Sequence, residues 1–230
     1  MSNQQLTPLQ CELREVLQQP GCPLCHLVAR AEQTFLDSLT YERIIDVPTR
    51  EALQQSRGMC ARHARDWRAL KGSALPIALV YHAGIKDLLR DTESEPGRGL
   101  FRKPVTGAQL AQQLDASVPC PVCQLGEQTA ARYGGVLLDD INDAEVQAAL
   151  EACGGLCLTH LRLVLRHAGL SGKAKTLVAV QRRIWAALHD ELSEFLRKND
   201  YRFTSDPMGA ERDSWLRALH ILSGMPLEKE

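Results

Sequence analysis

The sequence predicts an all-α protein built from two pseudo-repeated, zinc-binding helical halves. Apolar residues recur at three- and four-residue spacing along nearly the whole chain, and few runs alternate with a period of two. One four-ligand motif occurs twice, and a polar segment rich in Pro and Gly separates the two copies. We therefore expect a first half over residues 1–91, a linker over 92–106 and a second half over 107–230.

The repeated motif is a C-P-x-C pair followed, after a long interval, by a C-x-x-H pair. The interval between the two pairs is 34 residues in the first copy and 33 in the second. Three thiolates and one imidazole form a tetrahedral set that is typical of Zn²⁺. We expect each copy to bind one ion, and thus two zinc ions per chain, through Cys22, Cys25, Cys60 and His63 in the first half and Cys120, Cys123, Cys157 and His160 in the second.

The first half reads as a series of helices joined by short turns. An amphipathic helix over residues 24–39 begins within the first C-P-x-C pair, and Pro48 indicates a turn into a short helix. Gly58 ends that helix, the pair of Cys60 and His63 begins the next one, and a further helix covers residues 75–90.

The second half repeats this plan and extends it. The longest helix follows Gly172, runs for about 25 residues with one apolar stripe and is expected to be the spine between the halves. A turn at Pro207 separates it from a last amphipathic helix that carries Trp215. The helices expected before it cover residues 107–114, 122–138, 143–152 and 157–168.

Other chemistries use the same residue types. The C-P-x-C pairs resemble oxidoreductase dithiols, but the chain lacks their βαβ context, and a Cys3His set also suits an iron–sulfur cluster. Cys22 to His26 spells the haem-attachment string C-x-x-C-H, which the second copy breaks at Gln124. Closed four-ligand sites are usually structural, so we favour structural zinc and expect no catalysis, although enzymatic activity stays undecided.

Two cysteines fall outside the repeated motif. Cys153 lies four residues before Cys157 and could substitute as a ligand, but a small buried residue at a helix end is the simpler interpretation. Cys11 has no partner in the pattern.

The helices that carry the ligand histidines are basic, and no acidic residue occurs from Ala152 to His189. Arg65 and Arg162 each follow a ligand histidine by two residues, so we expect them to donate to the thiolates. The alternative is a surface for phosphates or nucleic acid, which the net charge of −1 does not favour. The residues concerned are Arg65, Arg162, Arg166, Lys173, Lys175, Arg182 and Arg183.

The C-terminal tail combines aromatic and charged residues. We expect its aromatic side chains to anchor a terminal helix on the core, and a partner surface is the alternative, because Tyr, Trp and Arg are enriched in binding hot spots. The candidates for that surface are Asp200, Tyr201, Arg202, Phe203 and Trp215.

Localisation and partners follow from the same residues. The N-terminus lacks the pattern of a signal peptide, and no stretch approaches the roughly 20 apolar residues of a membrane span. We expect a cytoplasmic binding or adaptor module with a protein or small-ligand partner and no membrane contact. A thiol or iron–sulfur redox sensor and a nucleic-acid binder are the alternatives.

The paired CPLC…GMCARH and CPVC…GLCLTH elements, together with the FLRKNDYRF…PMGAERDSW tail, resemble a bacterial family of unknown function. The resemblance covers nearly the full length. It implies a two-site helical protein in which the eight ligand positions and the tail are integral parts, and it implies no particular activity.

Overall fold

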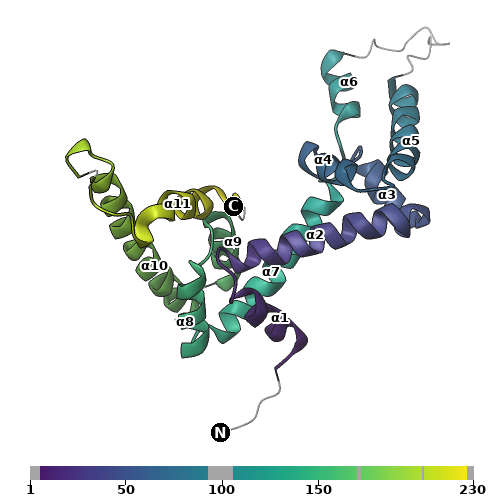
Figure 1. The fold of residues 1–230 in the computed structure, drawn as a ribbon. Helices are drawn as coiled ribbons and strands as arrows, with labels where there is room; N and C mark the ends of the chain where they lie inside the picture. The colour runs from purple at the N-terminus through teal and green to yellow at the C-terminus, as the bar shows by residue number, and fades with distance from the viewer. Residues whose placement is uncertain (1–5, 93–105, 170–171, 204, 227–230) are drawn as a thin grey trace, which may run out of the picture. The chain divides into compact units, whose positions relative to one another are not determined.

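The computed structural model describes residues 6–92, 106–169, 172–203 and 205–226. Within these ranges the secondary structure is helical throughout, with eleven α-helices, three short 3-10 helices and no strand (Figure 1). The prediction of an all-α protein is therefore confirmed.

The chain forms two compact units whose boundaries differ from the expected halves. Unit 1 comprises residues 1–30 and 127–230, and unit 2 comprises residues 31–126. Two long helices, α2 (Pro23–Tyr41) and α7 (Pro121–Asp140), each begin in one unit and end in the other. The division at residues 91 and 107 is thus wrong for the compact units, and residues 93–105 of the expected linker lie outside the described residues.

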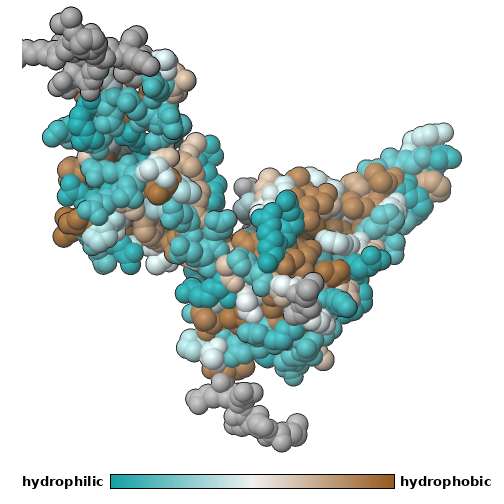
Figure 2. Space-filling model, turned by 180° about the vertical axis from the view of Figure 1, so that it is seen from behind, coloured by the Kyte–Doolittle hydropathy of each residue, from teal (hydrophilic) through white to brown (hydrophobic). Residues whose placement is uncertain are grey.

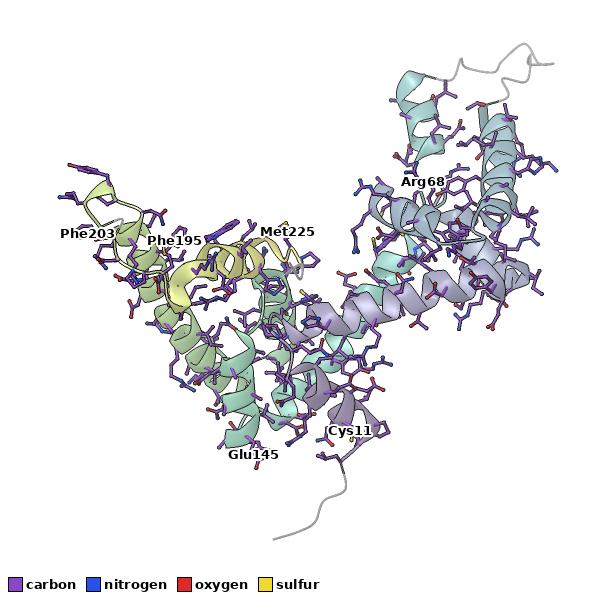
Figure 3. The ribbon with its side chains drawn as sticks, viewed as in Figure 1. Cys11, Arg68, Glu145, Phe195, Phe203 and Met225 are labelled. Atoms are coloured by element: carbon purple, nitrogen blue, oxygen red, sulfur yellow. The ribbon has the colours of Figure 1, made fainter. Side chains whose placement is uncertain are left out.

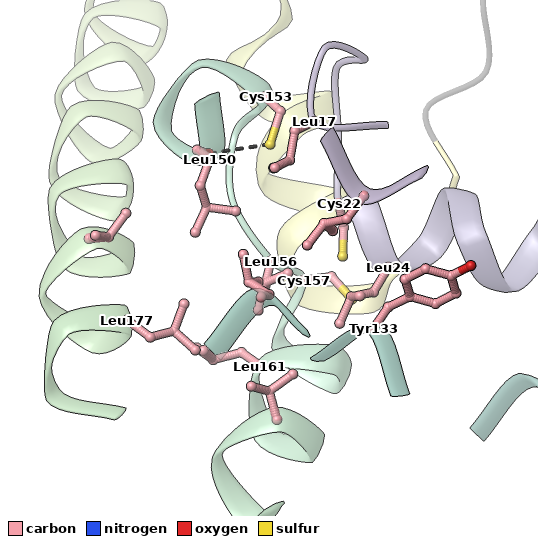
Figure 4. Close-up of a cluster of buried hydrophobic side chains, with 14 of the residues drawn as sticks. Leu17, Cys22, Leu24, Tyr133, Leu150, Cys153, Leu156, Cys157, Leu161 and Leu177 are labelled. Carbon is pink, nitrogen blue, oxygen red and sulfur yellow. Dashed lines mark hydrogen bonds between the residues drawn. The ribbon is translucent and has the colours of Figure 1, made fainter. Parts of the chain in front are cut away.

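Unit 1 holds the larger core. Its further helices are α1 (Pro8–Val16), α8 (Ala144–Cys153), α9 (Leu158–Ala168), α10 (Gly172–Lys198) and α11 (Ser214–Ser223), with 3-10 turns at Tyr201–Phe203 and Ala210–Asp213. Leu17, Leu24, Leu150, Leu156 and Leu177 meet in this core beside Cys22 and Cys157 (Figure 4). The ligand cysteines of unit 1 are therefore part of its hydrophobic interior.

Unit 2 has a smaller core around one tryptophan. Its helices besides the shared ones are α3 (Val47–Gln55), α4 (Ala61–Ala69), α5 (Ala74–Thr92) and α6 (Gly107–Leu114), with a 3-10 turn at Arg43–Ile45. Trp67 is fully buried and donates from Nε1 to Oγ1 of Thr40 over 3.0 Å. Leu36, Leu39, Leu53 and Val122 complete the buried cluster.

Two features depart from the sequence-based expectations. Helix α1 was not predicted, although Thr7, Pro8 and Gln10 form a capping box with proline in the first turn. The long helix α10 lies wholly in unit 1, where it packs against α8, α9 and α11, so it is not a spine between the halves. The helices shared by the two units are α2 and α7.

Candidate metal centres

The centre of unit 1 joins the first C-P-x-C pair to the second C-x-x-H pair. Nδ1 of His160 lies 3.5 Å from Sγ of Cys22, 3.3 Å from Sγ of Cys25 and 3.3 Å from Sγ of Cys157. The sulfurs of Cys25 and Cys157 are 3.7 Å apart. Ligands separated by about 130 residues thus converge on one point.

The centre of unit 2 makes the reciprocal pairing. Nδ1 of His63 lies 3.4 Å from Sγ of Cys60, 3.5 Å from Sγ of Cys120 and 3.4 Å from Sγ of Cys123. The sulfurs of Cys60 and Cys123 are 3.7 Å apart. All eight predicted ligand residues therefore lie in two groups of four, but the predicted pairing within each half is wrong.

The length of the shared helices explains the exchange. A helix of 19 residues, such as α2, carries the chain about 28 Å from its first residue, since each residue rises about 1.5 Å. The nine-residue helix α3 spans less than half that length, so it does not by itself carry the chain back along α2 to the level of Cys25. Helices α7 and α8, with 20 and 10 residues, impose the same constraint on Cys157.

The ligand separations match those around a single tetrahedral ion. Zn–S bonds of about 2.3 Å and Zn–N bonds of about 2.0 Å place two sulfurs roughly 3.8 Å apart and a sulfur and a nitrogen roughly 3.5 Å apart. The observed separations of 3.3 to 3.7 Å agree with both values. All cysteines are free, and no disulfide competes with this arrangement. Each group can therefore hold a metal ion.

Each ligand pair sits at the start of a helix. The C-P-x-C pairs begin α2 and α7, and Cys60 and Cys157 are the residues that precede α4 and α9. Backbone N–H groups at helix N-termini favour negative charge, which suits thiolates.

The bends that deliver the third cysteine are held by neighbouring helices. Gly58 and Gly155 adopt positive φ angles of 96° and 79°, which a side chain would strain. The backbone N–H of Met59 donates to the hydroxyl of Tyr81 over 3.3 Å, and that of Leu156 donates to Oε1 of Gln181 over 2.9 Å. Helices α5 and α10 thereby hold equivalent bends in the two units.

Crowding three thiols together makes their ionisation uneven. Burial, followed by the thiols of Cys157 and Cys25, raises the pKa of Cys22, whereas the thiols of Cys22 and Cys25 hold the pKa of Cys157 below its usual value. In unit 2, burial and the thiol of Cys60 raise the pKa of Cys123 to about 12. A divalent cation would stabilise all three thiolates of a centre at once.

In the unit 2 centre, a carboxylate lies next to the ring nitrogen of His63 that faces away from the thiols. Nε2 of His63 lies 3.2 Å from Oε1 of the buried Glu32, although the N–H direction is not aligned for a regular hydrogen bond. Arg62 holds the same carboxylate with two bonds of 2.8 and 3.0 Å. Burial and the charge of Arg62 lower the pKa of His63, which favours the neutral form that binds metal.

In the unit 1 centre, the neighbouring contact is made to the backbone of a ligand cysteine and not to the ligand histidine. The backbone N–H of Cys22 donates to Nε2 of His220 over 2.8 Å, and Nδ1 of His220 donates to the carbonyl of Met225 over 2.5 Å. Met225 follows the end of α11, where Figure 3 labels it. The sequence positions equivalent to Glu32 and Arg62 hold Ala130 and Thr159, so these positions do not repeat the carboxylate arrangement in unit 1.

We expect Glu32→Gln to lower the metal affinity of the unit 2 centre by about 10- to 100-fold, because the carboxylate orients His63 and raises its basicity. Competition with a chromophoric chelator would show one weakened and one unchanged ion per chain. Asp37→Asn on the same helix is the matched control, since Asp37 contacts Gln33 and no ligand. Equal weakening of both ions would contradict this role.

The arginines expected to serve the thiolates do not do so. Arg65 and Arg162 are exposed, and no hydrogen bond joins either one to a ligand cysteine in the described part of the chain. Two residues after the histidine, a helical side chain points away from the ligand face, whereas Arg62 reaches Glu32 from the position before His63. Glu32, Arg62 and His220 were missed because each acts through a residue at least 30 positions away, and no local spacing marks such a contact.

The remaining basic candidates lie on the surface of unit 1. Lys173 pairs with Asp139 over 2.7 Å, and Nε of Arg183 donates to Glu151 over 2.8 Å. Arg166, Lys175 and Arg182 are exposed. The ion pairs reduce the charge that is free to meet a phosphate.

We therefore expect only weak binding to DNA or RNA. If phosphates did bind, the logarithm of affinity would fall with log salt by about 0.7 to 0.9 per phosphate neutralised. Replacing Lys175 and Arg182 by Gln should then flatten the slope, while the zinc content stays unchanged. Tight, salt-sensitive binding at physiological ionic strength would contradict the expectation.

The tail candidates form a surface rather than a core. Tyr201 is 83% exposed and Trp215 is 49% exposed, so they do not anchor the tail as expected. Arg202 pairs with Asp200 over 2.7 Å, and the guanidinium of Arg197 stacks over the ring of Phe203. The tail is buried instead at Glu211, Ser214, His220 and Ile221.

The two additional cysteines stay outside the centres. Cys153 is buried in unit 1, and its thiol donates to the carbonyl of Leu150 over 3.3 Å (Figure 4). Cys11 is exposed on α1 (Figure 3). The interpretation of Cys153 as a small buried residue is therefore confirmed.

No described helix is both long and apolar enough to cross a membrane.

Comparison with known proteins places the chain among uncharacterised relatives. It is 28% identical over 217 residues to "Uncharacterized 23.9 kDa protein in xynA 3'region" from Caldicellulosiruptor sp. (strain Rt8B.4), which covers 91% of this chain and 98% of that protein. No solved structure matches. The family model described as "Family of unknown function (DUF6062)" matches residues 9–229. A match of this extent shows that the chain belongs to this family of unknown function.

Proposed function

We propose that the chain is a non-catalytic helical scaffold that binds two zinc ions and presents surfaces to a protein or small-ligand partner. The observation that carries the proposal is the convergence of eight ligands from four helix starts into two tetrahedral groups. An ion in each group would join α2 to α9 and α7 to α4. Zinc would thereby hold together segments that are remote in sequence.

The ligand sets argue against catalysis at these centres. Catalytic zinc normally keeps one coordination position for water or substrate, whereas here four protein ligands complete the tetrahedron. The short sulfur–sulfur separations also favour a single ion over an iron–sulfur cluster, because a cluster would spread its ligands over several metal atoms. Reduced thiolates of this kind suit the cytoplasm, where we place the protein.

A binding role is supported by apolar side chains on the surface. Figure 2 shows hydrophobic side chains on the exposed face of unit 1. Trp215, Leu219 and Leu222 are 49%, 40% and 67% exposed, and their spacing places them along one side of α11. Exposed apolar groups that cluster in this way are typical of interaction sites.

Metal analysis of the purified protein tests the scaffold directly. Native mass spectrometry should show two zinc ions per chain that are lost together with folding when the protein is denatured. A metal-free protein with full thermal stability would contradict the proposal. A brown protein that contains iron and sulfide would show that the centres hold an iron–sulfur cluster instead of zinc.

Photo-crosslinking tests the partner surface. A photo-crosslinking residue at Tyr201 should give a discrete adduct in cells, and one at the exposed Glu145 of α8 is the control.

A thiol redox sensor is the second candidate, favoured by the unequal exposure of the two centres. Cys60, Cys120 and Cys123 are all partly exposed, whereas in unit 1 Cys25 is partly exposed and Cys22 and Cys157 are fully buried. Peroxide would oxidise the thiolates of Cys120 and Cys123 to a disulfide, peroxide would be reduced to water, and the zinc ion would leave. One ion released reversibly from unit 2 would support a sensor, and retention of both ions under mild peroxide would exclude it.

A further inference from the structure

Helix α5 carries two apolar faces on opposite sides. Ile77, Val80 and Tyr81 pack against the core of unit 2, and Pro76 is buried. On the other side, Leu75, Leu79, Ile85 and Leu89 are 69%, 55%, 55% and 64% exposed. A helix that is apolar on both sides is normally covered on both, so the outer face lacks a covering element among the described residues.

The outer face is symmetric about His82. At 100° per residue, the four apolar residues and His82 fall within an arc of about 120° that is centred on His82. Leu75 and Leu89 each lie seven residues from His82, and Leu79 and Ile85 each lie three residues from it. The spacing therefore reads the same in both directions along the helix.

We propose that this face of α5 binds the same face of a second copy of the chain, in an antiparallel pair with a two-fold axis at His82. A two-fold interface brings residue i onto residue j and residue j onto residue i. In this register Leu75 meets the partner's Leu89, Leu79 meets the partner's Ile85, and the two His82 rings meet at the axis. Every apolar residue of the face thus meets another apolar residue.

Ala78 and Lys86 also lie within this arc, about 40° on either side of His82, and they fit the same register. Lys86 lies opposite the partner's Ala78, whose small side chain leaves room for the lysine stem to cover apolar surface while its ammonium group stays in water. Both residues are exposed on α5. A parallel arrangement would instead place each lysine beside the other.

The area of the face predicts a dimer of moderate strength. Each exposed Leu or Ile offers on the order of 100 Å² of apolar surface. Two such faces, with His82 and Ala78, bury roughly 1,000 Å² in total, at the lower limit for a specific interface. This inference goes beyond the proposed metal scaffold and depends on neither centre.

Sedimentation analysis of the zinc-loaded chain tests the interface. Wild-type protein should convert from monomer to dimer between about 1 and 100 µM, the range of a micromolar dissociation constant. Leu79→Asp should stay monomeric throughout, with unchanged zinc content and helix content. Leu222→Asp, which charges the exposed face of α11, should dimerise like the wild type. A monomeric wild type at 100 µM, or loss of the dimer through Leu222→Asp alone, would overturn the proposal.

Cross-linking tests the register separately. In a Cys11→Ser background, His82→Cys should couple to its own copy with a short bismaleimide, because both copies lie at the axis. Thr92→Cys should not couple, because its two copies would lie about 30 Å apart along the helices. The Cys11→Ser chain alone measures reaction at the metal-binding thiols. Equal coupling at positions 82 and 92 would contradict the antiparallel register.

Discussion

Replacing Cys22 and Cys157 together by Ser will leave one zinc ion per chain, whereas replacing Cys22 and Cys60 together will leave none. The first pair belongs to one centre and the second pair spans both. A centre that loses a thiolate keeps at most three ligands and binds metal weakly, and the binding energy of structural zinc is part of the folding energy. Native mass spectrometry of the two double variants counts the ions directly.

Two further variants serve as controls. Cys22→Ser with Cys120→Ser should also remove both ions, and Cys11→Ser with Cys153→Ser should keep both, because neither residue belongs to a centre. If each half of the sequence bound its own ion, the first two double variants would give the opposite result. That outcome would show the exchanged pairing to be wrong.

Removal of both ions by excess chelator will unfold the chain, and unit 2 will respond most strongly. Structural zinc in small domains contributes on the order of 10–16 kcal/mol, which is as large as the roughly 5–15 kcal/mol that stabilises a whole domain. The core of unit 2 has five buried side chains among the described residues, against twenty-two in unit 1. In unit 2, therefore, less buried apolar surface is available to compensate for the stabilising free energy that is lost with the ion.

The tryptophans report on the two units separately. Trp67 is fully buried in unit 2, whereas Trp185 and Trp215 are 36% and 49% exposed in unit 1. A Trp185→Phe, Trp215→Phe variant leaves Trp67 as the single fluorophore, and its emission should shift to the red as the chelator removes zinc. Added zinc should restore the original spectrum. An unchanged spectrum in the fully metal-free chain would show that the core of unit 2 stays folded without its ion.

The sequence determined most of the local structure and named all eight residues of the two candidate metal centres. Apolar spacing places the helices well because the period of 3.6 residues depends on neighbours along the chain, as in α2 and α10. The motif spacing identifies the ligands because two ligands on one helical turn need only local geometry, as for Cys157 and His160. Even α1, which was missed, has a local signal in its capping box.

Only the tertiary structure decided which pairs of ligands meet. Both C-x-x-H pairs are chemically equivalent partners for Cys22 and Cys25, so composition and spacing cannot choose between them. The choice depends on how far α2 and α7 carry the chain before it turns back. The contact of His220 with Cys22 is equally tertiary, because it joins the start of α2 to a residue of α11 that lies 198 positions later in the chain.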